Sequence, residues 1–383
     1  MTILGATGSI GRSTATLLEA APEGAFTVEA LVAGRDAAAL ADMARRLRPA
    51  IAVLADPAGL PALRDALSGT NIATAAGPGA VREAAMRPTD WTMAAIVGFA
   101  GLRPILDALS LGATLALANK EPLVCAGELV LRTAAASGAT VLPTDSEHNA
   151  IFQALDTRDP AMVERIILTA SGGPFRNATI EEMRAATPEQ AVKHPVWSMG
   201  AKISVDSATL FNKGLEVIEA ARLFPVPHER IEVLVHPQSA VHGLVQYADG
   251  SLLAQLGSPD MRTPIAYALA WPNRMHAAVP RLDLAALSRL DFSAPDETRF
   301  PALRLCRAAL SAGAGAPTIL NAANEVAVAR FLARRLGFLD IARVVEETLE
   351  ALGAPPANDL DDILALDAGA RVRAEAVADR LAA

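Results

Sequence analysis

Short apolar runs alternate with longer helical patterns through the first 145 residues of the chain. Runs of this length, bounded by turn residues and separated by helices, are typical of strands in a parallel sheet that is covered on both faces. The pattern therefore predicts an N-terminal α/β domain. Its expected strands are residues 2–4, 26–32, 51–55, 92–99, 114–118 and 140–142.

After residue 145 strand patterns and helical patterns are mixed, which predicts a central α/β domain. One helix is expected to begin at Asp206 or Ser207, which are good capping residues, and to end at Phe224, before Pro225. The strands expected in this part are residues 165–169, 232–235, 241–247 and 251–256.

From Ala302 onward the pattern is helical and rich in Ala, Leu and Arg, which predicts a small helical bundle. We expect Asn321 to Glu325 to cap a helix that extends to Leu336. The expected division is therefore a parallel-sheet domain, a catalytic α/β domain, a proline-dotted linker and a C-terminal helical domain. Their boundaries are 1–145, 146–270, 271–296 and 297–383.

Composition narrows the range of partners. The chain has 383 residues, a net charge of -8 and only 4% aromatic residues. An acidic chain with few aromatic rings lacks the clustered cations and stacking surfaces that nucleic acids need. No apolar run reaches the length of a membrane span, and the first residues leave no room for a signal peptide. We expect a cytoplasmic protein with a small-molecule partner, no nucleic acid and no membrane.

The first expected strand runs directly into three glycines, Gly5, Gly8 and Gly11. A strand, a glycine turn and a helix in this order can place a pyrophosphate at a helix N-terminus, as in a Rossmann-like domain. The spacing G-x-x-G-x-x-G is a weak signal alone, but its position at the first strand strengthens it. At the end of the second strand Arg35 suits a 2′-phosphate, hence NADP; it could also be an ordinary loop arginine.

Two carboxylates, Asp145 and Glu147, follow the strand at 140–142. In an extended segment residues i and i+2 point to the same side, so both could face one cation. The alternative is a capping box, in which Thr144 and Glu147 only satisfy backbone groups at a helix start. A third carboxylate, Glu216, is expected on one helical stripe with Asn212 and Lys213.

That stripe could equally be a solvated face with a Lys213–Glu216 pair. The distribution of lysines favours a functional role for the stripe. Only four of the 34 basic residues are lysines, and all four fall between Lys120 and Lys213. Lys120 follows a strand of the expected sheet, where ligands of such sheets bind, although it could simply pair with Glu121.

Two loops of the central domain could contact an anionic ligand. Ser171 stands at a strand end before two glycines and could offer a hydroxyl and backbone N–H groups to an anion, unless it forms a plain turn. Residues 194–200, which include Trp197 and Met199, could form a lid that excludes water. Core packing of Trp197 and Met199 is the alternative.

Two other classes of protein fit the sequence less well than an NADP-dependent enzyme with a metal site. A short-chain dehydrogenase needs a Tyr-x-x-x-Lys pair, but Tyr247 and Tyr267 are followed four residues on by Ser251 and Trp271. A non-catalytic NADP-sensing protein remains as the alternative from another class. In that case the acidic residues would be caps and surface pairs.

Taken together, six blocks of the sequence closely resemble the 1-deoxy-D-xylulose 5-phosphate reductoisomerase family. The sequence departs from the usual family sequence in two small ways. Ala6 stands where the family usually has a serine, and Arg35 stands where another basic residue can occur. The resemblance continues into the C-terminal helical segments. The blocks are Gly5 to Gly11, Ala118 to Glu121, Asp145 to Gln153, Ser171 to Arg176, His194 to Glu216 and Met261 to Ile265.

The resemblance implies an NADPH-dependent enzyme of the non-mevalonate isoprenoid pathway. Such an enzyme rearranges and reduces 1-deoxy-D-xylulose 5-phosphate, a phosphosugar, to 2-C-methyl-D-erythritol 4-phosphate, usually as a homodimer. It also implies that Asp145, Glu147 and Glu216 bind Mg²⁺, Mn²⁺ or Co²⁺, and that Lys120 and Glu147 act in catalysis.

The remaining residues matched by the resemblance fall into two groups. The implied substrate contacts are Lys120, Ser146, Glu147, Ser171, His194, Trp197, Met199, Ser207, Asn212, Lys213 and Glu216. The implied cofactor contacts are Thr7, Gly8, Ser9, Ile10, Gly34, Arg35, Asp36, Asn119, Glu121 and Gly200.

Overall fold

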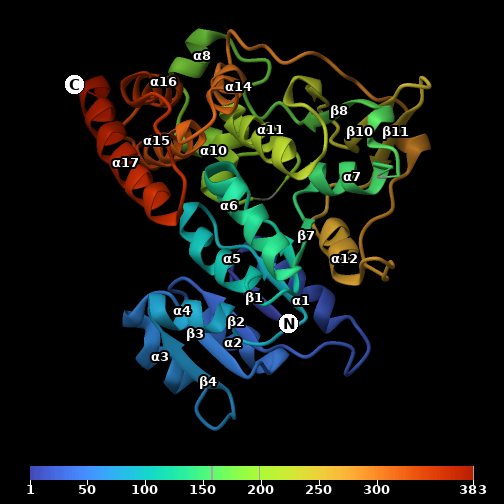
Figure 1. The fold of residues 1–383 in the computed structure, drawn as a ribbon, viewed down its shortest axis with the longest axis vertical. Coiled ribbons are helices and arrows are strands. Elements are labelled where there is room, and N and C mark those ends of the chain that lie inside the picture. The colour runs from blue at the N-terminus through green and yellow to red at the C-terminus, as the bar shows by residue number, and fades with distance from the viewer. Residues whose placement is uncertain (157, 198, 383) are drawn as a thin grey trace. The chain divides into compact units, whose positions relative to one another are not determined.

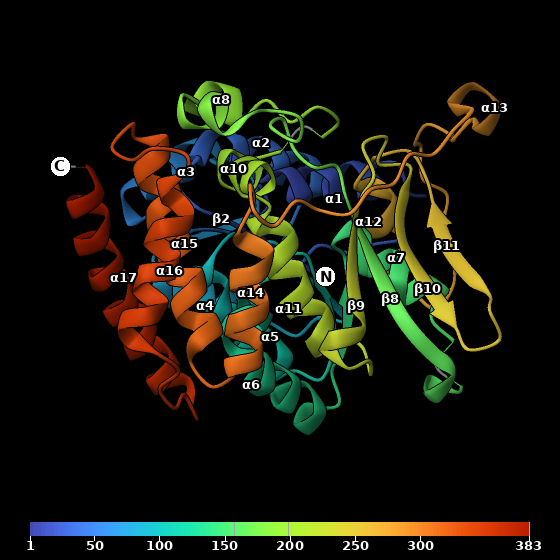
Figure 2. The ribbon, with the colours of Figure 1, turned by 90° about the horizontal axis from the view of Figure 1, so that it is seen from above.

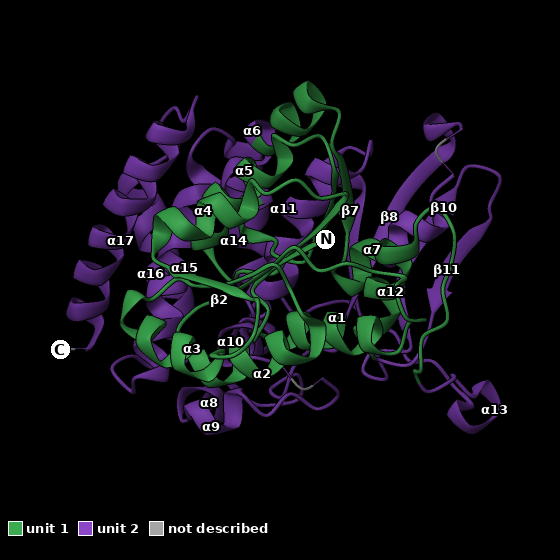
Figure 3. Ribbon diagram, turned by 90° about the horizontal axis from the view of Figure 1, so that it is seen from below, with its two compact units in different colours: residues 1–122, 130–149, 260–279 green, residues 123–129, 150–259, 280–383 purple. Residues whose placement is uncertain are grey.

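The computed structural model describes residues 1–156, 158–197 and 199–382. The chain forms two compact units, coloured separately in Figure 3. Two helices, α6 and α7, contribute residues to both units. Unit 1 consists of residues 1–122, 130–149 and 260–279, and unit 2 of residues 123–129, 150–259 and 280–383.

Unit 1 is built on a parallel sheet. In the described part of the chain this sheet has seven strands in the order β4-β3-β2-β1-β5-β6-β7. The predicted α/β fold with a parallel sheet is therefore confirmed. One strand, β4, was missed, because its sequence ATAA has a single β-branched residue, Thr74, among three alanines. The strands are β1 Thr2–Leu4, β2 Ala30–Ala33, β3 Ile51–Leu54, β4 Ala73–Ala76, β5 Trp91–Ala94, β6 Thr114–Leu117 and β7 Thr140–Pro143.

The order of these strands creates a switch point between β1 and β5, because the chain builds outward from β1 in one direction and returns to its other side at β5. Ligands of open parallel sheets bind beyond the carboxyl ends of the strands at such a point. The helices of this part are labelled in Figure 1. They are α1 Ser9–Glu19, α2 Ala37–Leu47, α3 Leu60–Ala66, α4 Pro78–Ala85, α5 Leu102–Leu109, α6 Glu121–Ser137 and α12 Arg262–Ala270.

Helix α12 joins unit 1 although it comes late in the sequence. It packs against α1, and the indole Nε1–H of Trp91 donates a hydrogen bond to the carbonyl oxygen of Ala268 at 3.1 Å. This long-range contact involves two buried residues, so it holds the segment to the sheet domain.

Unit 2 contains a mixed sheet, whose strands are seen lengthwise in Figure 2. Its order is β11-β10-β8-β9, with β10 antiparallel to both neighbours and β8 parallel to β9. All four expected strands are present within two residues of their predicted bounds. The strands are β8 Val163–Ala170, β9 Ile231–Val235, β10 Val241–Tyr247 and β11 Leu252–Leu256.

Helices form the rest of unit 2, and α14 to α17 lie side by side at the C-terminal end of the chain (Figure 2). The predicted C-terminal helical region is therefore present, whereas the predicted domain boundaries stay predictions. The helices, with α7 shared between the units, are α7 Ser146–Ala154, α8 Ile180–Arg184, α9 Pro188–Ala191, α10 Ala201–Thr209, α11 Phe211–Leu223, α13 Leu284–Leu287, α14 Ala302–Ala312, α15 Ala316–Leu332, α16 Asp340–Leu352 and α17 Leu360–Ala382.

Two helix predictions in this part were wrong. The helix expected from Asp206 or Ser207 to Phe224 is two helices, because Leu210 adopts a left-handed conformation with φ of 65° and separates α10 from α11. Asn321 to Glu325 does not cap a helix but lies inside α15, which begins at Ala316 and ends at Leu332. Asn321 and Asn324 are fully buried there, so tertiary contacts rather than capping explain these two amides.

Among the described residues, no helix combines the length and the apolar character that crossing a membrane requires.

Candidate active site

The glycine loop, residues 5–11, connects β1 to α1 at the switch point of the sheet. Gly5 has a φ of 93°, and a Cβ there would stand 2.3 Å from the carbonyl oxygen of Ala95, at the end of β5. A Cβ on Gly11 would stand 2.3 Å from the carbonyl oxygen of Ala6. Gly8 is the N-cap of α1 and supplies no side chain to its first turn. The backbone N–H groups of this turn are therefore available to an anion.

Except for Gly200, the residues expected to contact the cofactor follow the carboxyl ends of strands β1, β2 and β6. Thr7 and Ile10 are partly buried, and Gly8 and Ser9 are exposed. At the end of β2, Gly34 and Arg35 are exposed, and the Asp36 carboxylate accepts a hydrogen bond from the Ala39 N–H at 2.9 Å, which caps α2. Arg35 is therefore placed beside an exposed helix start, as a 2′-phosphate contact would require.

The end of β6 carries the buried segment Asn119, Lys120 and Glu121. The Asn119 amide donates to the Gly98 carbonyl oxygen at 3.1 Å and packs directly against Gly101, where a Cβ would stand 2.2 Å from its nitrogen. Lys120 forms an ion pair with Asp145, and both side chains are mostly buried. The suggestion that Lys120 pairs only with Glu121 is therefore wrong.

Asp145 and Glu147 lie at the start of α7, not in an extended segment. Since α7 begins at Ser146, the expectation that residues i and i+2 share one side is wrong here. The capping box is also wrong, because the buried hydroxyl of Thr144 makes no hydrogen bond to any described residue. The Ser146 hydroxyl donates instead to the Glu147 carboxylate.

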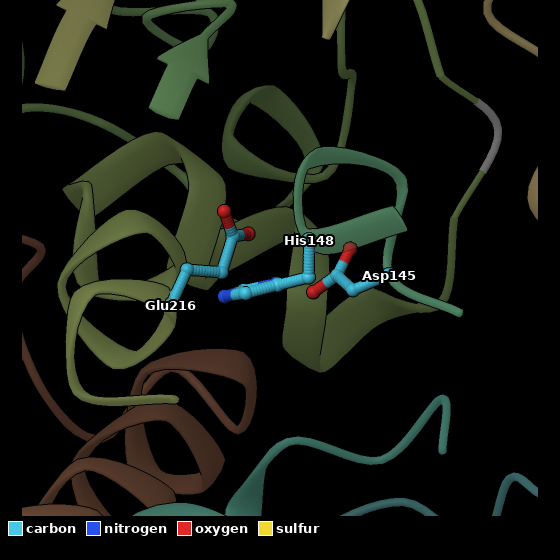
Figure 4. A group of neighbouring side chains, drawn as sticks. All are labelled: Asp145, His148 and Glu216. Atoms are coloured by element: carbon cyan, nitrogen blue, oxygen red, sulfur yellow. The ribbon is translucent and has the colours of Figure 1, made fainter. Parts of the chain in front are cut away.

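His148 is a neighbour of Asp145 that the sequence argument missed. The helical geometry brings its ring to the same side as Asp145, and their potential metal-binding atoms lie within 4.8 Å of each other (Figure 4). Helical spacing of i and i+3 would have revealed this neighbour if the helix had been predicted to begin at Ser146. Asp145 and His148 thus offer neighbouring donor atoms for a divalent ion at one end of α7, whereas Glu147, whose carboxylate accepts from Ser146, is not part of this group.

The α10–α11 corner, residues 206–213, lies in unit 2 where the chain turns at Leu210. Beyond it, Glu216 is fully buried and its carboxylate accepts hydrogen bonds from the Asn212 amide and the Lys213 ammonium. Lys213 is itself 3% exposed, so the solvated-face alternative is wrong. Burying such a pair costs several kcal/mol of desolvation, which is unusual for a purely structural contact.

Helix α11 reaches this position by close packing on α14. A Cβ on Gly214 would stand 2.4 Å from the Sγ of Cys306 and 3.2 Å from the carbonyl oxygen of Ala302. Only glycine allows this approach, and the neighbouring Lys213 and Glu216 are oriented by it.

The turn that carries Ser171 packs against the backbone of Ser207. Gly173 has a φ of 68°, and a Cβ there would stand 2.8 Å from the carbonyl oxygen of Ser207. The Ser171 hydroxyl lies 2.7 Å from Nε2 of His194 and accepts the Gly173 N–H at 3.2 Å. Two serine hydroxyls and a glycine turn of this kind can hold a phosphate group.

His194 also shapes the expected lid. Its Nδ1 accepts the backbone N–H groups of Val196 and Trp197 at 3.2 and 2.8 Å, so in the neutral ring the proton is on Nε2. Burial lowers the pKa of His194 to about 4, which keeps the ring neutral at pH 7. Trp197 is half-buried, with its ring centroid 6.1 Å from that of His242, and Met199 is partly buried.

The last residue of the expected lid, Gly200, is the N-cap of α10 and is exposed. Ser198 lies outside the described residues. The lid therefore leads directly into the helix that carries Ser207, and its closure stays a prediction.

The residues present fit the two bound groups that the sequence predicted, a divalent metal ion and a dinucleotide cofactor. Carboxylates are the donors that Mg²⁺ and Mn²⁺ prefer. The glycine loop leaves no space for a side chain where a pyrophosphate would approach the backbone, as a dinucleotide site requires. The fold and site together define an α/β oxidoreductase with a dinucleotide-binding sheet.

Comparison with known proteins gives the family. Models of 1-deoxy-D-xylulose 5-phosphate reductoisomerase match residues 1–127, and models of its C-terminal domains match residues 141–224 and 256–373. The chain belongs to the 1-deoxy-D-xylulose 5-phosphate reductoisomerase family, so the resemblance drawn from its motifs is confirmed. The predicted class, an NADP-dependent oxidoreductase, is confirmed with it.

Curated relatives and solved structures agree. The chain is 62% identical to the 1-deoxy-D-xylulose 5-phosphate reductoisomerase of Rhodospirillum centenum, over 97% of this chain and 92% of the relative. The structure of the Zymomonas mobilis reductoisomerase in complex with NADPH matches with a TM-score of 0.93 and 51% identity, over 99% of both chains. A reductoisomerase complex with NADPH, fosmidomycin and magnesium matches with a TM-score of 0.94 and 42% identity, over 99% of this chain and 98% of that one.

Proposed function

We propose that this protein converts 1-deoxy-D-xylulose 5-phosphate to 2-C-methyl-D-erythritol 4-phosphate with NADPH and a divalent metal ion. The observation that carries the proposal is 62% identity over 97% of the chain to a reductoisomerase. The site chemistry supports it, since the carboxylates offer oxygen donors to a divalent ion, the lysines offer positive charge, and the glycine loop leaves backbone N–H groups to an anion.

Asp145, Glu147 and Glu216 are the proposed metal ligands. Mg²⁺ and Mn²⁺ favour oxygen donors, so the three carboxylates are preferred over the ring nitrogen of His148. When bound, the ion supplies Lewis-acid polarisation of the substrate oxygens, and NADPH supplies the hydride. The ammonium group of Lys120, already paired with Asp145, adds positive charge at this place and favours negative charge that develops on a substrate oxygen.

The phosphate of the substrate is proposed to bind at Ser171, Ser207, Asn212 and Lys213. Lys213 supplies the charge, and the serine hydroxyls and the Asn212 amide supply hydrogen bonds of defined direction. Ser146 and Glu147 are proposed to contact the sugar hydroxyls. His194, Trp197 and Met199 are proposed to cover the ligand and exclude water.

NADPH is proposed to bind at the glycine loop and at the ends of β2 and β6. The N–H groups at the start of α1 would hold the pyrophosphate. Arg35 would hold the 2′-phosphate, which explains a preference for NADPH over NADH. The proposed contacts are Thr7, Gly8, Ser9, Ile10, Gly34, Arg35, Asp36, Asn119, Glu121 and Gly200.

The test is NADPH consumption, followed at its absorbance band, with 1-deoxy-D-xylulose 5-phosphate and Mn²⁺. We expect steady consumption that stops when a chelator is added and resumes when Mn²⁺ is restored. Full activity in the presence of chelator would contradict the metal proposal. The absence of any consumption with this substrate, by folded protein that binds NADPH, would contradict the proposed reaction.

We also propose a cytoplasmic homodimer. The described strand β11 is at the edge of its sheet and exposes Leu252, Leu253 and Leu256 by 49%, 49% and 37%. An apolar sheet edge in water favours association with a second copy. Sedimentation equilibrium should give twice the chain mass, and Leu253→Lys should shift it toward the monomer.

A further inference from the structure

Asp206 is a buried carboxylate for which the proposed reaction supplies no role. It lies in the last turn of α10 and is 1% exposed. One partner is the Lys202 ammonium, one helical turn earlier, at 2.8 Å. The other is the Asn324 amide of α15, which donates to its Oδ1 at 2.8 Å. A buried charge with two such partners is held in one orientation.

Asp206 precedes Ser207, one of the proposed phosphate contacts. The backbone of Ser207 is enclosed on another side by Gly173, with no room for even a Cβ between them. The Thr209 hydroxyl also donates hydrogen bonds to the carbonyl oxygens of Val205 and Asp206, which stabilises the C-terminal end of α10. A movement of Asp206 would therefore move Ser207 and press on the glycine turn that carries Ser171.

Asn324 belongs to a helix that is buried on nearly all sides. Helix α15 packs against α16 and α17, and both Asn321 and Asn324 have 0% exposure. Burying an amide is costly unless its hydrogen bonds are made. An apolar contact would join α10 to α15 at lower cost, so a polar one points to control of orientation rather than of stability alone.

We propose that Asp206, held by Asn324 and Lys202, is a positioning residue that sets the phosphate-binding geometry of Ser207. The C-terminal helices thereby act on substrate affinity through the Asn324 amide without contacting the ligand. This inference rests on the proposed function, because it assigns Ser207 to the substrate phosphate. Asp206 itself does not touch the ligand, since its negative charge faces Lys202 and α15 and would repel a phosphate.

The decisive variant is Asn324→Ala, with Asn321→Ala as the matched control. Asn321 lies one turn earlier on the same helix, is equally buried, and donates to Glu325 rather than to Asp206. For Asn324→Ala we expect about a tenfold rise in KM for 1-deoxy-D-xylulose 5-phosphate, the effect of losing one hydrogen bond to a charged group. The KM for NADPH and kcat should stay within about twofold, and Asn321→Ala should leave all three within about twofold.

A second readout does not depend on turnover. Inorganic phosphate, titrated into the full-length protein and followed by its protection against thermal unfolding, should bind about tenfold more weakly to Asn324→Ala than to wild type. Wild-type protein that binds phosphate but does not consume NADPH would count against the proposed reaction and leave this comparison intact. The two proposals can therefore fail separately.

Asp206→Asn covers the case in which Asn324→Ala does not fold. It keeps the shape and an acceptor for Asn324 but removes the charge that faces Lys202, so phosphate affinity should fall by about threefold to tenfold. Unchanged phosphate affinity and unchanged substrate KM in a folded variant of either position would overturn the inference. Equal shifts in Asn321→Ala would also overturn it, because the effect would then belong to the packing of α15.

Discussion

The glycine loop of unit 1 and the α10–α11 corner of unit 2 are both proposed to bind phosphate, yet they are built differently. The glycine loop uses backbone N–H groups, and its geometry depends on positions such as Gly5 and Gly11 where no side chain fits. The α10–α11 corner uses charged side chains such as Lys213, which is buried and donates to the Glu216 carboxylate one helical turn later. Binding at the glycine loop should therefore be most sensitive to added volume, and binding at the α10–α11 corner to the removal of charge.

The largest expected effect comes from removing one charge near the corner. Glu216→Gln keeps the volume of a fully buried side chain but removes a proposed metal ligand and the counter-charge of Lys213. We expect turnover to fall by about a thousandfold or more, with NADPH affinity unchanged. Turnover is measured at saturating Mn²⁺ and NADPH binding by fluorescence.

Glu219→Gln is the matched control, because Glu219 is a glutamate of the same helix with 1% exposure. Its turnover should fall far less. An equal loss in both variants would mean that buried charge in α11 supports folding rather than the metal.

The next effect concerns volume in the glycine loop. Gly11→Ala places a Cβ against the backbone of Ala6, which cannot move aside as a flexible side chain could. We expect NADPH to bind at least about tenfold more weakly and the free energy of unfolding to fall by about 1–3 kcal/mol, the usual cost of overpacking. Isothermal titration and urea unfolding measure the two quantities.

Gly79→Ala is the control in the same unit, since Gly79 lies in helix α4 with open space around its Cβ position. This change should leave NADPH affinity unaltered and raise stability by a few tenths to about 1 kcal/mol. If NADPH also bound more weakly to Gly79→Ala, the glycine loop would not be specially sensitive to added side-chain volume.

A smaller effect should separate the two hydrogen-bonding sides of His194. His194→Asn can keep an acceptor near Nδ1 for the Trp197 N–H, whereas His194→Gln can keep a donor near Nε2 for Ser171. If Ser171 binds phosphate, KM for the substrate should rise by about threefold to tenfold in the Asn variant and less in the Gln variant. The reverse order would assign the main role of His194 to the lid.

The stability of the protein should also depend on pH through His242, where burial lowers the pKa to about 4. Between pH 6.5 and 4 the unfolded chain therefore binds more protons than the folded protein does. Stability from this group is full above pH 6.5 and is lost as the pH falls toward 4, by roughly 2–3 kcal/mol at most. Urea unfolding at pH 7 and 5 should show a smaller difference in His242→Gln than in wild type.

His276→Gln is the reference for that experiment, because His276 is exposed. It should retain the pH dependence of the wild type. An equal reduction in His276→Gln would assign the effect to a general change in charge.

Much of the α/β fold and the glycine loop could be predicted from the sequence, because their signals are local. Strands such as β10, from Val241 to Tyr247, are apolar runs between turn residues, and the glycine spacing follows directly from backbone sterics. The strand β4 was missed because alanine carries little strand preference, and its pairing with β3 supplies what its composition lacks.

The residue types of the site were determined by the sequence, whereas their partners were decided by the tertiary structure. Nothing local to Lys120 selects Asp145 as a partner, and nothing local to Asn324 selects Asp206, 118 positions away. Likewise the left-handed turn at Leu210 contradicts the uninterrupted helical pattern around it. The physical reason is that a buried charge is stable only beside a specific partner, and that partner is brought close by the packing of distant helices and strands.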